Sequence, residues 1–144
     1  MKIMNYTTKV PAARSIAEIE VLLASNGATH VMKEYMGDGR VISIKFQLAN
    51  KVGYMLPANT ERVFATLTKG KRNFQKKTWE AQSERVAWRV LLDWLHAQLS
   101  LIAIGQAEFD QVMLPYAFDG KQTLYERIKS SEDLKGRLLG GSSD

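Results

Sequence analysis

The longest element that the sequence predicts is "TWEAQSERVAWRVLLDWLHAQLSLIAI", residues 78–104. Its apolar residues recur at helical spacing and cover most of the circumference of one helix, which Gly105 ends. A helix that is apolar on nearly all sides is either central and packed on several faces, or buries one side in a partner. Trp88 and Trp94 both belong to its apolar positions, so we expect them in the core.

The segment that precedes this helix by about thirty residues changes to the period of a strand. In "RVISIKFQL", residues 40–48, Ile42, Ile44, Phe46 and Leu48 alternate with more polar neighbours, which predicts one buried face. Strands are also predicted over residues 29–35 and 52–57, with turns at "MGDGR" and "ANK". Three strands joined by short turns predict an antiparallel meander.

Helices are predicted on both sides of the meander. "SIAE", Ser15–Glu18, has the pattern of a capping box and predicts a helix over residues 16–26. Asn59 is expected to cap a helix that runs to about residue 69. Further short helices are predicted over residues 107–114 and, after the capping box "TLYE", from residue 124 to about residue 130.

The predicted class is therefore α+β: an N-terminal helix, a three-stranded antiparallel meander, a long central helix and short C-terminal helices. We expect one domain over residues 1–139 and a disordered tail over residues 140–144, "GGSSD".

Composition excludes several kinds of site. The chain has no cysteine, which rules out disulfides, thiolate metal sites and a cysteine nucleophile. It shows no secretory h-region and no apolar run of about 20 residues, so we expect a cytoplasmic protein without a membrane span.

No pattern of catalytic residues stands out. Asp93, His96 and Ser100 suggest a hydrolase triad, but all three lie on one helix and no nucleophile elbow accompanies them. His30 lies in another element, and the aspartates lack the paired spacing of a magnesium site. We expect no catalytic residue, metal or cofactor, and hence a non-enzymatic protein.

The charge of the chain is concentrated in one segment. Between Glu61 and Arg89 there are eight basic and three acidic residues, a net charge of +5 that equals that of the whole chain. Two aromatic residues are interleaved with the basic ones. The candidate nucleic-acid-binding residues are Arg62, Lys69, Lys71, Arg72, Phe74, Lys76, Lys77, Trp79, Arg85 and Arg89. Basic side chains neutralise phosphates and aromatic rings stack on unpaired bases. The competing interpretation is a solvated hinge between two helices.

Several stretches of the chain resemble uncharacterised small proteins encoded by phages and prophages. They are "SIAEIEVLLASNGA", "ERVAWRVLLDWLHAQLSLI", "VMLPYAF" and "GKQTLYE". The resemblance implies a mobile-element context and carries no assigned activity. The order of helix, meander and long helix is also similar in topology to the core of Rad52-type strand-annealing proteins.

Two functional hypotheses follow. The first is a phage or mobile-element protein that binds nucleic acid through residues 62–89, with single strands favoured because no duplex-reading motif is present. The second is a protein-interaction module, such as an inhibitor or accessory subunit of a host or phage complex. It would use the helix of residues 78–104 as its interface, with a homo-oligomer as its simplest form.

Overall fold

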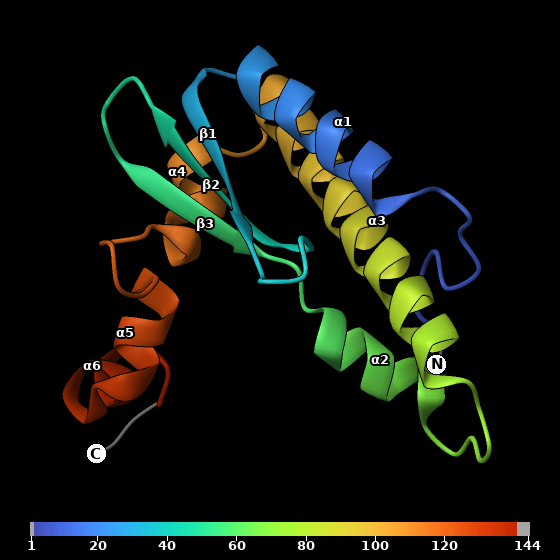
Figure 1. Cartoon of the computed structure of the whole chain (residues 1–144). Helices are drawn as coiled ribbons and strands as arrows, with labels where there is room; N and C mark the ends of the chain where they lie inside the picture. Colours follow the sequence, from blue (N-terminus) through green and yellow to red (C-terminus); the bar gives the residue numbers. More distant parts are fainter. Residues whose placement is uncertain (1, 141–144) are drawn as a thin grey trace.

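The computed structural model describes residues 2–140 and confirms the predicted α+β class (Figure 1). The order of elements is α1 (Ala12–Ser25), β1 (Ala28–Tyr35), β2 (Val41–Leu48), β3 (Gly53–Pro57), α2 (Thr60–Thr68), α3 (Lys76–Ala103), α4 (Phe109–Met113), the 3-10 helix η1 (Leu114–Tyr116), α5 (Leu124–Ser130) and α6 (Glu132–Leu138). The segment predicted as a disordered tail lies, apart from Gly140, outside the described residues.

The three strands form an antiparallel sheet in the order β1-β2-β3. The beginning of the outer edge of β3 is covered by the chain that follows η1: Tyr54 bridges to Ala117, and the Phe118 amide donates to the Gly53 carbonyl at 2.9 Å. The C-terminal quarter of the chain is thus joined to the sheet through backbone hydrogen bonds.

The alternation predicted for β2 is wrong at one position. Glu34 of β1 pairs with Ser43, while the next residue, Tyr35, pairs with Val41, so Ile42 is the extra residue of a bulge. A bulge reverses the alternation of side chains beyond it. Val41 therefore packs against the core in place of Ile42, which is exposed.

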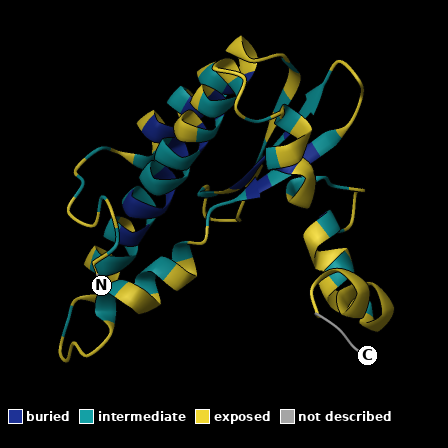
Figure 2. Ribbon diagram, turned by 180° about the vertical axis from the view of Figure 1, so that it is seen from behind, coloured by how far each residue is buried: buried dark blue, intermediate teal, exposed yellow. Residues whose placement is uncertain are grey.

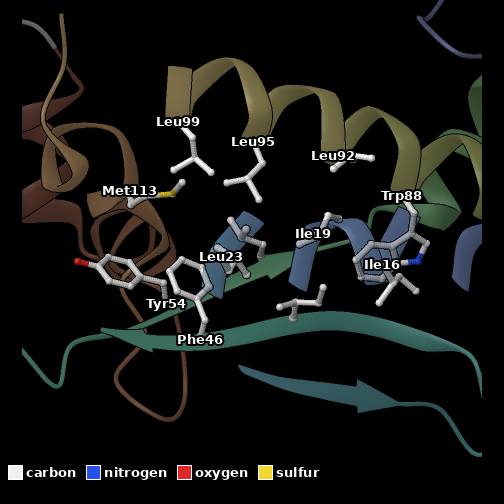
Figure 3. Close-up of a cluster of buried hydrophobic side chains, with 12 residues drawn as sticks. Ile16, Ile19, Leu23, Phe46, Tyr54, Trp88, Leu92, Leu95, Leu99 and Met113 are labelled. Atoms are coloured by element: carbon white, nitrogen blue, oxygen red, sulfur yellow. The ribbon is translucent and has the colours of Figure 1, made fainter. Parts of the chain in front are cut away.

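One hydrophobic core lies between the sheet and the helices α1 and α3 (Figure 3). Its buried members are Ile16, Ile19, Leu23, Ile44, Phe46, Tyr54, Leu56, Trp88, Leu92, Leu95, Leu99 and Met113. The prediction that Trp88 is a core residue is confirmed, since its side chain is fully buried. Trp94 is half-buried at the edge of this core, with its ring 5.5 Å from that of Tyr116 in an edge-to-face arrangement.

Helix α3 is packed on several sides within its own chain. It contacts α1, α2 and α4. Among the described residues, the only large hydrophobic residue exposed at this helix is Ile104, one residue beyond its end. The large apolar residues of α3 are therefore buried or half-buried against its own chain.

The two predicted capping boxes have different outcomes. The box at Thr123 is confirmed: its hydroxyl accepts from the Glu126 amide, and the Glu126 carboxylate accepts from the Thr123 amide. The box at Ser15 is wrong, because α1 begins one turn earlier, after Pro11. Ser15 is fully buried inside the helix, and its hydroxyl has no hydrogen-bond partner among the described residues.

The remaining differences lie near the C-terminus. The helix predicted over residues 107–114 is divided into α4 and η1, and η1 contains Pro115. Helix α6 was not predicted, although Ser131 caps it by accepting from the Leu134 amide at 3.3 Å. Across residues 2–140, no helix has both the length and the apolar content needed to span a bilayer.

Candidate nucleic-acid interface

Helices α2 and α3 pack on each other and are joined by a loop of residues 69–75 at one end of the molecule (Figure 1). Two residues in this loop have left-handed backbones, Gly70 with a φ of +77° and Asn73 with a φ of 55°. Glycine and asparagine are the residues that adopt this region most readily. The sequence therefore allows the chain to reverse its direction tightly here. This reversal brings the end of α2 beside the start of α3.

This reversal gathers five basic residues, which we call the basic tip: Lys69, Lys71, Arg72, Lys76 and Lys77. All five are exposed, and Figure 2 shows the loop as a mostly exposed segment. Within residues 2–140, none of them forms an ion pair with an acidic side chain. The five charges of the tip are therefore not neutralised by ion pairs within the described residues.

The start of α3 adds to the positive potential of the tip. Lys76 and Lys77 occupy its first two positions, its first turn holds no acidic residue, and no side chain caps it. A helix N-terminus carries a partial positive charge and unpaired amide donors, so cations are unfavourable there and anions are favourable. An anion bound at the tip would relieve this repulsion.

The two aromatic candidates are held in place by neighbouring side chains. The Phe74 ring lies 6.0 Å from that of Phe64 in an edge-to-face contact, which anchors the loop on α2. The Lys71 ammonium lies 4.7 Å from the centre of the Trp79 ring and covers one of its faces. Phe74 is thus a structural anchor, whereas Trp79 can stack on a base on that face only if Lys71 moves away.

Arg85 and Arg89 do not extend the basic tip along α3. The Arg85 side chain donates through Nε to Gln82 at 2.9 Å, and the Gln82 amide donates to the backbone carbonyls of Tyr6 and Thr8. Arg89 lies about 20 Å along the helix from Lys76, where it is ion-paired with Glu18 of α1 at 3.1 Å. Both arginines stabilise contacts with the N-terminal part of the chain.

A groove of about 580 Å³ lies beside the basic tip, between the β1–β2 turn and the start of α2 and α3. Arg62 and Lys76 line it, together with apolar residues that include Ile42 and Phe64. Its other lining residues include the three acids of the charged segment, namely Glu61, Glu80 and Glu84. Sequence spacing did not reveal this groove, because its walls come from the hairpin and the helices together.

The residues that suggested a hydrolase triad have other partners. The Asp93 carboxylate accepts from the Asn5 amide group at 2.7 Å, and the Ser100 hydroxyl donates to the His96 backbone carbonyl at 2.8 Å. His96 is exposed. Ser100 therefore directs its proton to the backbone of its own helix and not to an imidazole.

Metal ligands do not gather elsewhere in the described part of the chain, where no three histidine, aspartate or glutamate side chains are grouped suitably for an ion. The strongest electrostatic feature is thus the basic tip. No protein-family model, curated protein or solved structure matches the chain.

Proposed function

We propose that this protein binds nucleic acid through the basic tip, with Arg62 at the mouth of the neighbouring groove, and that it prefers single strands. The observation that carries the proposal is that, within residues 2–140, five exposed basic residues form no ion pair with an acidic side chain, whereas seven other basic side chains do. Phosphate oxygens are the ligands that such a cluster attracts most strongly.

The preference for single strands is supported by two features of the fold. The tip is the end of two packed helices joined by a loop, and the sequence has no recognisable helix-turn-helix motif for a major groove. Trp79 offers a ring face beside the charges, where an unpaired base can replace the Lys71 ammonium. The binding needs no catalytic group, and the mobile-element setting in this proposal rests on the sequence resemblance alone.

Fluorescence anisotropy with a labelled oligonucleotide across a salt series tests the proposal. Six phosphate contacts to a single strand predict a slope of log K against log salt of roughly −4. A duplex of the same sequence should bind more weakly. Absence of binding to both oligonucleotides at low salt would overturn the proposal.

Charge reversal locates the site. Lys69→Glu, Arg72→Glu and Lys77→Glu together remove three contacts without touching the Lys71–Trp79 pair or the lining of the groove. The matched control reverses three exposed lysines near the C-terminus: Lys121→Glu, Lys129→Glu and Lys135→Glu. We expect the first variant to lose binding and the control, which changes the net charge equally, to retain most of it. Equal losses would show that net charge alone drives association.

The same charges would also attract an acidic protein surface, which is the alternative hypothesis. Capture from a host lysate before and after nuclease treatment separates the two. If the oligonucleotide does not bind and an acidic protein is retained after nuclease treatment through the same three basic residues, the tip is a protein-docking site.

A further inference from the structure

The two edges of the sheet are not equivalent. The outer edge of β3 is occupied at Gly53 and Tyr54 by Ala117 and Phe118, as described above. Strand β1 pairs only with β2, and within residues 2–140 the backbone of residues 28–35 forms no other hydrogen bond to the main chain. An open edge presents donors and acceptors in the spacing that another strand requires.

The open edge has few of the features that prevent strand pairing, and those it has lie near its ends or are already paired within the chain. It is eight residues long and contains neither proline nor glycine, and its irregularities lie near its two ends. Lys33 is neutralised by Glu20 of α1 at 3.2 Å, and Glu34 is engaged by Ser43 at 3.0 Å. Met32, at the centre of the strand, is 60% exposed. Natural sheets protect edges of this length with charges, prolines or bulges near the middle.

An apolar flank of α1 lies on the same side of the molecule as this edge. Glu20 of α1 reaches β1, whereas Glu18 reaches Arg89 on α3, so these two acids mark the two flanks of the helix. Successive residues of an α-helix are rotated by about 100° around its axis. On this basis, the exposed side chains that lie next to Glu20 around the helix are Ala13, Ala17, Val21 and Ala24. Val21 is 65% exposed. Small side chains of this kind allow a second helix to approach closely.

We propose that the open edge of β1 is the docking site for a second copy of this chain, in an antiparallel pair with its two-fold axis at Met32. In this register the five residues from His30 to Glu34, which lie between the two irregularities of the strand, all take part. Met32 lies opposite the partner's Met32. His30 lies opposite the partner's Glu34, and Val31 lies opposite the partner's Lys33.

Charge complementarity selects this register. The pair of His30 with the partner's Glu34 brings a hydrogen-bond donor to a carboxylate, and it forms twice because the interface is isologous. An axis at Lys33 would place two lysines directly opposite each other, an arrangement that is destabilising in a sheet. In this pair, the flank of α1 that contains Ala13, Ala17, Val21 and Ala24 faces the same flank of the partner's α1 across the Met32 axis, above the joined sheet.

The interface is independent of the proposed nucleic-acid site, because β1 contributes no residue to the basic tip. Sedimentation or light scattering of nuclease-treated protein tests it. We expect a species of twice the 16.2 kDa chain mass, dissociating on dilution. Met32→Lys places two lysines together at the axis and should raise the dimer dissociation constant about tenfold or more. The matched control Val52→Lys changes an exposed apolar residue at the opposite side of the sheet and should leave the dimer intact.

A cross-link tests the register directly. The chain contains no cysteine, so Met32→Cys introduces a single thiol per copy. Directly opposed residues of antiparallel strands have Cα atoms about 4.5–5.5 Å apart, which a disulfide can bridge. We expect Met32→Cys to form a covalent dimer under mild oxidation, and Val52→Cys to remain largely monomeric on a denaturing gel.

Either of two results overturns the proposal. One is a chain that remains monomeric at every concentration, with no cross-link in Met32→Cys. The other is a dimer that Met32→Lys does not weaken, which would place the interface elsewhere. Circular dichroism confirms that each variant is folded, since exposed substitutions of this kind usually change stability by about 0.5 kcal/mol or less.

Discussion

The guanidinium of Arg89 lies 3.1 Å from the carboxylate of Glu18, so the last base of the charged segment joins α3 to α1. Glu18 also lies 3.5 Å from Arg14 of its own helix. This pairing removes Arg89 from the proposed interface, although the residue belongs to the segment with the excess charge.

Arg89→Ala should therefore affect stability and leave binding unchanged. Both partners are partly exposed, so we expect the free energy of unfolding to fall by about 0.5–1 kcal/mol. Urea denaturation measures this loss, and anisotropy should give an oligonucleotide affinity close to that of the parent protein. A large loss of affinity would mean that Arg89 leaves Glu18 to contact the ligand.

Two buried serines of the helices provide a matched comparison. The Ser15 hydroxyl has no partner among the described residues, while the Ser83 hydroxyl donates to the Trp79 carbonyl at 2.6 Å. Removing an unsatisfied buried hydroxyl removes a desolvation penalty, and alanine is also the better helix former. Ser15→Ala should raise the free energy of unfolding by about 1 kcal/mol. Ser83→Ala removes a hydrogen bond, so in the same denaturation experiment its free energy of unfolding should rise less than that of Ser15→Ala, or should fall.

The tryptophans of α3 should differ in their contributions to the core. Trp88→Ala removes a fully buried ring and should cost about 3–5 kcal/mol through lost burial and the cavity it leaves. Trp94 is half-buried and can be partly replaced by water, so Trp94→Ala should cost less. Thermal and chemical denaturation of both variants provide the comparison, and equal losses would contradict the burial described here.

The turn that holds the covered edge of β3 should weaken in acid. Asp119 Oδ1 accepts from the backbone amides of Gln122 and Lys121, each at 2.9 Å, and these bonds hold the pKa of Asp119 below its ordinary value of 3.8. Because the pKa of Asp119 is lower in the folded than in the unfolded chain, its carboxylate stabilises the fold at pH values above the unfolded-state pKa. This stabilisation is lost as the pH falls through the folded-state pKa.

Asp119→Ala should therefore lower the Tm at pH 7, and the difference from the parent protein should shrink as the pH is reduced toward about 2. Circular dichroism melts across this pH range provide the measurement. Lys121→Ala is the control, because Lys121 takes part through its backbone amide and the substitution retains that donor. An undiminished Tm difference at the lowest pH would assign the loss to packing and not to the carboxylate.

Much of the fold could be predicted because its signals are local. The capping box at Thr123 and Glu126 needs only four residues and a following helix, and it forms as expected. The long helix α3 differs from its predicted bounds by two residues at the start and one at the end. Helix α6 could have been found from Ser131, the two acids that follow it and the bases of its last turn.

The errors concern contacts with distant parts of the chain. Ser15 resembles a cap, but the backbone before it is already helical from Ala12 onward. Ile42 continues the alternation of β2, yet the bulge is set by pairing with Tyr35 and Glu34 of β1.

The same limit applies to the candidate site. Lys69, Lys71 and Arg72 lie together because they are neighbours in the sequence around one tight turn. Arg85 and Arg89 are kept apart from these residues by their contacts with Gln82 and Glu18, respectively. Helical spacing within one segment cannot reveal the ion pair of Arg89 with Glu18, which lies 71 positions away in the sequence.

The covering of β3 by Ala117 and Phe118 limits how the sheet can grow. A sheet with two free edges can add strands at both ends and extend into a fibre, whereas a sheet with one free edge can pair only once. A pair formed through β1 uses the open edge of both copies, so assembly through β1 alone closes at two copies.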